Sequence, residues 1–275
     1  VSRRALCIGD STWGGGGRSA LAECLGRSVV AGNTNYSLLL VGSNSGNVVD
    51  STGTNRAIGC DAITGWRAGY FLTNSTEVWT TIGGLSRTGS PFLNLGVLSI
   101  PWYLTNYSVS LSSNDWVLFN LGMNPCISSE SDASMSAAIT TEFGAMDTII
   151  AAFKAAIPGI RIGMLITSPC NASQDAFAQD YGNGHTRNRV HRNLGLWAQT
   201  LIATYGGRES EKIWVWPYGL ALDPVNGFEY TTTPISTYWT NSVAVSARNS
   251  GVHPYVHGYY QLGDGLYTLL LGYEN

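Results

Sequence analysis

Residues 4–12 read RALCIGDST, an apolar run that ends directly in glycine, aspartate and serine. Runs of the same short and continuous apolar character lie at 36–41, 116–121, 161–167 and 212–216. Such runs are typical of strands that are buried on both faces of a parallel sheet. The five runs therefore predict a central, mostly parallel sheet of five strands.

Helical patterns lie between these runs. Apolar residues recur every three or four positions over 139–157 and over 190–205, and each pattern stops at a Pro-Gly or Gly-Gly pair. Shorter helices are expected near 19–25 and 258–271. Strands that alternate with helices predict a three-layer α/β/α sandwich. We expect residues 1–275 to form a single domain, with an irregular excursion at about 75–113.

The composition narrows the classes of function. Charged residues make up 12% of the chain, and the net charge is −3 without any basic run, so a nucleic-acid partner is not expected. No apolar stretch is long enough to predict a membrane span. The five cysteines lack metal-site spacing, and His185 and His191 have no carboxylate partner at ligand spacing, so we expect no metal.

Polar residues follow several predicted strands, at the sheet edge where parallel α/β folds bind ligands. Ser11 follows the first run and is either a nucleophile or an N-cap. Gly65, which follows the second, either lets a backbone N–H approach a ligand or forms a plain turn. Asn124 follows the third and either donates to an oxyanion or belongs to a turn before proline. His253 precedes the last helix and is either a proton acceptor or structural.

In combination, these residues resemble the four sequence blocks of the SGNH, or GDSL, family of serine hydrolases. The blocks here are IGDST, ITGWR, LGMNP and GVHPYVHGYYQLGD, and they span nearly the whole chain. The resemblance implies a flavodoxin-like SGNH hydrolase fold and an esterase that needs no cofactor. It implies that Ser11 is the nucleophile and His253 its base. The backbone N–H groups of Ser11 and Gly65 and the Asn124 side chain would form the oxyanion hole.

One departure from the family pattern concerns the partner of the histidine. The family places an aspartate three residues before the histidine, whereas Ser250 occupies that position here. The acceptor that orients His253 is then the Ser250 hydroxyl, a backbone carbonyl, or a distant carboxylate such as Asp223 or Asp264. We favour an uncharged acceptor, which predicts a weaker base.

The substrate is less clearly indicated. Trp13, Trp66 and Trp102 fall in or near predicted cleft loops, where aromatic faces suit sugar rings, although core packing explains tryptophans equally well. GSPFLN and HGYYQLGD resemble segments of family members that act on polysaccharides. We therefore expect a carbohydrate O-acetyl esterase acting on a small ester or an acetylated polysaccharide.

The alternative is a carbohydrate-binding or virion-attachment module with a hydrolase fold and weakened catalysis. An extracellular or virion-associated location is favoured over a cytoplasmic one, and the sequence does not indicate an oligomeric state. A Cys126–Cys170 disulfide is a hypothesis for an oxidising compartment, should the third and fourth strands be neighbours.

Overall fold

A computed structural model describes residues 2–30, 37–74, 76–181, 185–247 and 251–274. Its central sheet has seven strands in the order β11-β10-β9-β1-β4-β3, and β2 also pairs with β1. Every pair in this sheet is parallel except the antiparallel pair β3–β4. The strands are β1 (Ser2–Gly9), β2 (Ser37–Val41), β3 (Asn44–Val49), β4 (Asn55–Ala62), β9 (Trp116–Asn120), β10 (Arg161–Leu165) and β11 (Ile213–Trp216).

The five predicted strands are present, and the prediction missed the β3–β4 hairpin. Two strands pair with the same edge of β1. The first part of β1 pairs with β2, and its last two residues, Ile8 and Gly9, pair with Asp61 and Ala62 of β4. Its other edge pairs with β9. Gly65 therefore follows β4 and not β2, and this places it beside the end of β1.

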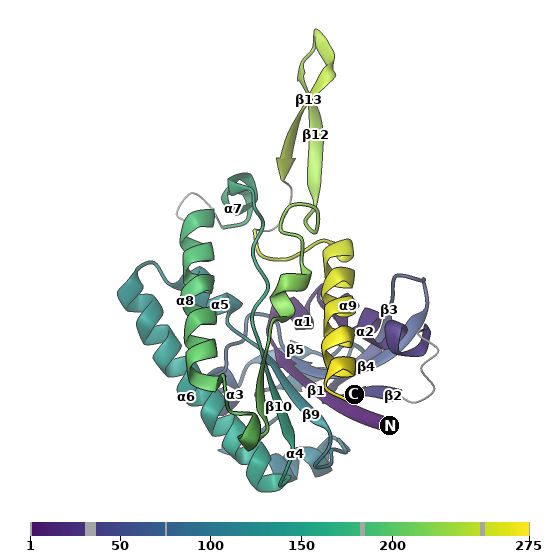
Figure 1. Cartoon of the computed structure of the whole chain (residues 1–275), viewed down its shortest axis with the longest axis vertical. Helices are drawn as coiled ribbons and strands as arrows, with labels where there is room; N and C mark the ends of the chain where they lie inside the picture. The colour runs from purple at the N-terminus through teal and green to yellow at the C-terminus, as the bar shows by residue number, and fades with distance from the viewer. Residues whose placement is uncertain (1, 31–36, 75, 182–184, 248–250, 275) are drawn as a thin grey trace.

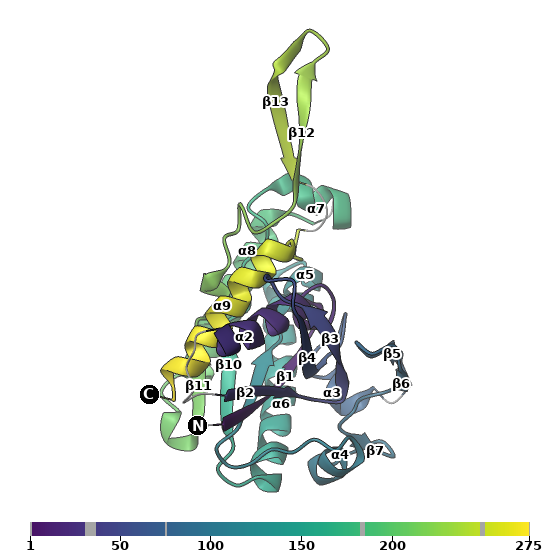
Figure 2. The same ribbon diagram turned by 90° about the vertical axis from the view of Figure 1, so that its right-hand side faces the viewer.

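Helices cover both faces of the sheet, as Figure 1 and Figure 2 show. Ala5 and Cys7 of β1 belong to one buried cluster with side chains of α2 (Arg18–Val30) and α9 (Val256–Gly272). Leu6 and Ile8, which point to the opposite face, pack with α6 (Asp132–Ala156) and α8 (Arg187–Tyr205). The observed layers confirm the predicted α/β/α architecture.

The long helices begin and end where the sequence supplies caps. Ser131 and Ser134 form a capping box at the start of α6, and the helix ends at Ile157 just before Pro158-Gly159. The Thr186 side chain caps α8, which ends at Gly206. These signals fix the lengths of the two helices that cover one face of the sheet.

Short elements connect the layers. Within the described residues 76–113 lie two small hairpins and one helix, and the side chains of Trp79, Phe92 and Tyr103 are buried in the cluster that contains Leu6 and Ile8. The short elements are α1 (Ser11–Gly14), α3 (Tyr70–Thr73), β5 (Val78–Thr80), β6 (Ser86–Thr88), β7 (Leu93–Asn94), β8 (Val97–Leu98), α4 (Ile100–Asn106), α5 (Met123–Ser128), α7 (Gln174–Tyr181), η1 (Glu209–Glu211) and η2 (Tyr218–Ala221).

A further hairpin, which the sequence analysis did not predict, extends away from the α/β body beyond α7 (Figures 1 and 2). It consists of β12 (Tyr230–Ser236) and β13 (Trp239–Ala247), which pair antiparallel. Because it lies between β11 and α9 in the chain, its base adjoins the segment that carries His253. Within the described part of the chain, no helix combines the length and apolar character needed to cross a bilayer.

All five cysteines are buried free thiols. Strands β9 and β10 are neighbours, as the disulfide hypothesis required, but Cys126 and Cys170 are not bonded to each other. The Cys170 thiol instead contacts the sulfur of Met123 at 3.8 Å. Burial raises the pKa of both thiols, which disfavours the thiolate that disulfide formation requires.

Candidate active site

Ser11 and His253 lie in direct contact although they are far apart in the chain. The distance from Ser11 Oγ to His253 Nε2 is 2.7 Å. Ser11 is the first residue of α1, directly beyond the end of β1, and His253 precedes α9. The structure thus brings together the serine and the histidine that the sequence motifs select, at hydrogen-bonding distance.

Asp10 fixes the turn that presents Ser11. Its carboxylate accepts hydrogen bonds from the Thr12 backbone N–H at 2.9 Å and from the Thr12 hydroxyl at 2.7 Å, and so caps α1. The Thr12 hydroxyl in turn accepts from Asn120 Nδ2 at the end of β9. Asp10 and Asn120 are buried, and their hydrogen bonds to Thr12 hold this turn in place. The sequence motifs assigned neither residue, because a motif does not show which side chains become buried.

The electrostatics of this turn follow from burial. Burial raises the pKa of the Asp10 carboxyl to about 6, although hydrogen bonds from Thr12 and from the Met123 backbone act in the opposite direction. Because Met123 is the first residue of α5, its backbone hydrogen bond places the start of this helix against the Asp10 carboxylate. Asp10 therefore ties the loop after β1 to the loop after β9, which carries Asn124.

Two of the glycines after Ser11, Gly14 and Gly17, are buried against neighbouring backbone. A Cβ on Gly14 would lie 2.6 Å from the Ala62 carbonyl oxygen of β4. A Cβ on Gly17 would overlap the carbonyl group of Thr12. Both glycines are needed because α1 approaches neighbouring backbone too closely for any side chain.

Gly65 and Asn124 lie on adjoining loops. The Asn124 amide nitrogen donates to the carbonyl oxygen of Trp66, the residue after Gly65, at 2.9 Å. Gly65 is exposed and has a φ of +81°, a conformation that favours glycine. Among the described residues, no acceptor takes the Gly65 backbone N–H. This N–H and the second Asn124 amide hydrogen are therefore available to a ligand.

The described residues do not include Ser250, the position that the sequence analysis considered as the acceptor for His253. The two carboxylates considered as alternatives have other partners. Asp264 pairs with Arg27, and Asp223 accepts hydrogen bonds from the backbone of Val225 and Asn226.

The tryptophans predicted to meet a sugar are mostly buried. Trp13 is fully buried and donates from Nε1 to the Tyr218 hydroxyl at 2.8 Å, and Trp66 packs edge-on against Phe71 in the core. The prediction is therefore wrong for these two residues, because their position after a strand does not determine the direction of the side chain. Trp102 is half-buried on α4 against the core cluster, next to Tyr107.

No protein-family model and no curated protein matches the sequence, but solved structures are similar in fold. A family 3 carbohydrate esterase from Talaromyces cellulolyticus has a TM-score of 0.53 at 16% identity, and the alignment covers 98% of this chain and 97% of that one. An acetyl esterase mutant with a bound acetate ion has a TM-score of 0.53 at 15% identity, and the alignment covers 98% of this chain and 97% of that one.

A lipase/acylhydrolase from Enterococcus faecalis has a TM-score of 0.50 at 10% identity, with coverage of 98% of this chain and 96% of that one. The chain has the SGNH hydrolase fold. This confirms the predicted fold class, with a sheet of seven strands in place of five. In the SGNH hydrolase fold of this chain, Ser11, Gly65 and Asn124 follow the three adjacent strands β1, β4 and β9.

Within the described part of the chain, no three side chains of His, Cys, Asp or Glu are grouped so that they would hold a metal ion. The chemistry that the site itself offers is that of a hydroxyl, an imidazole and amide donors.

Proposed function

We propose that the protein is a serine esterase that uses Ser11 and His253 as a catalytic pair. The observation that carries the proposal is the 2.7 Å contact between Ser11 Oγ and His253 Nε2. A serine hydroxyl is a weak nucleophile until a base takes its proton, and an imidazole at this distance is such a base. The available donors on Gly65 and Asn124 supply the second requirement, a place for developing negative charge.

The reaction follows from these positions. Ser11 Oγ attacks the ester carbonyl carbon while its proton passes to His253 Nε2. The tetrahedral oxyanion accepts hydrogen bonds from the backbone N–H groups of Ser11 and Gly65 and from the Asn124 amide. His253 then returns the proton to the departing alcohol. Water, activated by His253, hydrolyses the acyl-serine and regenerates the hydroxyl.

We propose an O-acetyl group on a carbohydrate as the ester. Two observations support this substrate class: the segments GSPFLN and HGYYQLGD resemble polysaccharide-active members of the family, and the chain shares its fold with a carbohydrate esterase and an acetyl esterase.

Hydrolysis of p-nitrophenyl acetate by the wild type and by Ser11→Ala tests the catalytic pair. We expect Ser11→Ala to lower kcat by at least about a thousandfold, and His253→Ala to have a similar effect, because the two groups act as a unit. Ser86→Ala, at an exposed serine of β6, is the matched control and should retain wild-type turnover. Wild-type turnover in Ser11→Ala would refute the proposal. A wild type that binds polysaccharide but hydrolyses no ester would favour the carbohydrate-binding alternative.

A further inference from the structure

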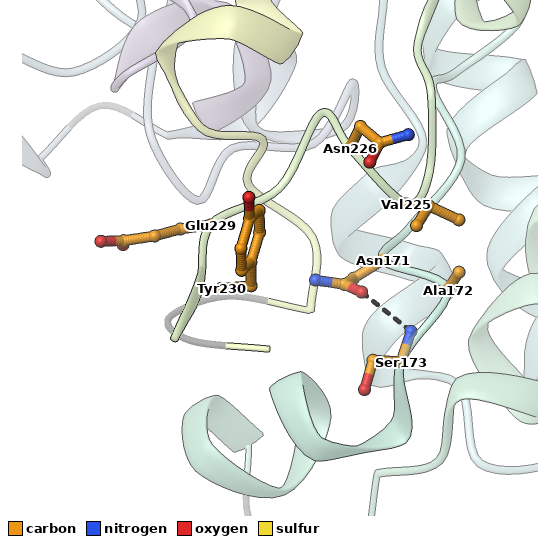
Figure 3. Close-up of a pocket in the computed structure, with 7 residues that line it drawn as sticks. All are labelled: Asn171, Ala172, Ser173, Val225, Asn226, Glu229 and Tyr230. Atoms are coloured by element: carbon orange, nitrogen blue, oxygen red, sulfur yellow. Dashed lines mark hydrogen bonds between the residues drawn. The ribbon is translucent and has the colours of Figure 1, made fainter. Parts of the chain in front are cut away.

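A cavity of about 480 Å³ lies between the loop after β10 and the segment that leads into β12 (Figure 3). This volume is in the range of small-molecule binding sites. None of its lining residues was assigned a function by the sequence motifs. The lining residues are Asn171, Ala172, Ser173, Val225, Asn226, Glu229 and Tyr230.

Both walls of the cavity are bonded to the loop that carries His253. The Asn171 backbone N–H donates to the Gly251 carbonyl oxygen at 2.8 Å. On the other wall, the Gly227 carbonyl oxygen accepts from the Tyr255 N–H at 2.9 Å. Gly251 and Tyr255 each lie two residues from His253, so both walls are anchored to the short segment that carries His253.

The mechanism determines which part of a substrate lies on that side. The carbonyl oxygen must face Gly65 and Asn124, whereas the departing alcohol oxygen must lie next to His253, which protonates it. The alcohol portion of an ester therefore extends past His253 toward the cavity. For a carbohydrate ester, that portion is the sugar.

Asn171 provides the observation that points to a ligand. The side chain is only 3% exposed, and its Oδ1 accepts from the Ser173 N–H at 2.8 Å. Its Nδ2 is buried and has no hydrogen-bond partner among the described residues. Figure 3 shows this nitrogen on the side of Asn171 that faces Tyr230. A buried amide without an acceptor is unfavourable, and a hydroxyl oxygen in the cavity would satisfy it.

The remaining lining residues suit a neutral, hydroxyl-rich ring. Tyr230 is 59% exposed and offers an aromatic face, and Val225 and Ala172 add apolar surface. None of the described residues that line the cavity is Lys or Arg, and the carboxylate of Glu229 extends away from the other labelled residues in Figure 3. The guanidinium of Arg187 adjoins the cavity, where it donates from Nη1 to the carbonyl oxygen of Ala172 at 2.6 Å.

We propose that this cavity is the subsite for the sugar ring that bears the ester, with Tyr230 stacking on the ring and Asn171 Nδ2 donating to one of its hydroxyls. The proposal rests on the proposed esterase function and adds to it the residues that set alcohol specificity. Tyr230 and Asn171 bind the leaving sugar and take no part in proton transfer.

Two kinds of ester distinguish binding of the sugar from catalysis. In p-nitrophenyl acetate the leaving group is a phenol, whereas in mono-O-acetylated methyl glycosides of glucose, xylose and galactose the leaving group is a sugar. The preference for a sugar is measured as kcat/KM for the best glycoside divided by kcat/KM for p-nitrophenyl acetate. We expect Tyr230→Ala and Asn171→Ala each to lower this preference by about tenfold, mainly because KM for the glycoside rises. Tyr230→Phe retains the ring and should retain the ratio. Tyr238→Ala is the matched control, because Tyr238 lies in the same hairpin, 93% exposed and away from the cavity.

Isothermal titration of the same glycosides into Ser11→Ala tests the cavity without hydrolysis. Binding that disappears in Ser11→Ala/Tyr230→Ala supports the subsite even if the wild type hydrolyses neither ester, in which case only the esterase proposal fails. If the wild type hydrolyses both esters but Tyr230→Ala and Asn171→Ala change neither the ratio nor the binding, the subsite is refuted and the esterase stands. The subsite is also refuted if Ser11→Ala binds no glycoside and the wild type does not prefer glycosides to p-nitrophenyl acetate.

Discussion

Asn124 has two amide hydrogens, and the protein itself uses one of them. The bond from Asn124 Nδ2 to the Trp66 carbonyl oxygen holds the amide beside Gly65. An amide that is already oriented does not have to reorganise when charge develops on the substrate, and this is the condition under which an oxyanion donor is most effective. The remaining hydrogen is the one that we assign to catalysis.

Replacing Asn124 with alanine should lower kcat for p-nitrophenyl acetate by roughly a hundredfold or more, because removal of one oxyanion donor costs about 3–4 kcal/mol of transition-state stabilisation. KM should change much less. Steady-state kinetics measures both, with the exposed Asn55→Ala as the control for an asparagine outside the site. A fall of less than about tenfold in a variant that keeps the wild-type Tm would remove Asn124 from the mechanism.

At the scale of elements, the start of α5 decides where Asn124 lies. Gly122 has a φ of +130°, and a Cβ at this position would lie 2.5 Å from the indole ring of Trp197 on α8. The loop after β9 can therefore turn toward Asp10 and Gly65 only because residue 122 has no side chain. Packing of α5 against α8 thus sets the position of Asn124, the side chain that we propose as an oxyanion donor.

Gly122→Ala should lower the free energy of unfolding by about 2 kcal/mol or more, through backbone strain and overpacking against Trp197. It should also reduce kcat, because Asn124 is displaced. Gly144→Ala is the matched control: this glycine is exposed on α6 with open space at its Cβ, and alanine there should stabilise the helix slightly. Urea denaturation measures both changes, and equal stability of the two variants would contradict the packing argument.

The sequence predicts the elements whose apolar pattern is continuous, and it fails where polar residues form strands. The runs that became β1, β9, β10 and β11 are buried on both faces and are therefore readable. Strand β3, NSGNVV, and strand β12, YTTTPIS, contain glycine, proline and short polar side chains, so neither predicts a strand. Because the β3–β4 hairpin was not predicted, the sequence analysis placed Gly65 after β2, whereas in the structure it follows β4.

For the whole molecule, the β12–β13 hairpin joins two parts of the proposed site. Tyr230 lies where β12 leaves the cavity, and the chain returns through β13 toward the segment that carries His253. The motifs predicted Ser11 and His253 because their neighbours in the sequence are distinctive. Asn171 lies in a loop and Tyr230 at the start of β12, neither segment has an apolar period, and only the tertiary structure brings the two together. Burial of Trp13 and Asp10 depends on the same long-range packing.

The stability of the folded chain is expected to fall as the pH rises from about 4 to about 7. Burial raises the pKa of Asp61 to about 7 and that of Asp10 to about 6, from an ordinary value of 3.8. Over this window the folded protein holds protons that the unfolded chain has released, so each group lowers the free energy of unfolding by up to about 1.4 kcal/mol per pH unit. His191, whose pKa is lowered by burial, opposes this trend below its ordinary value of 6.5.

Asp61→Asn isolates one of these groups. The Asp61 carboxylate is bonded to the Ser43 backbone N–H and hydroxyl and to the Tyr103 hydroxyl, and an asparagine can retain an acceptor toward Ser43. Whatever constant cost the substitution carries, the variant should become progressively more stable relative to the wild type between pH 4 and pH 7, because it has no proton to release. Urea denaturation of both proteins across this range measures the difference. A difference that stays constant with pH would show that the carboxyl of Asp61 titrates in the folded protein as it does in the unfolded chain.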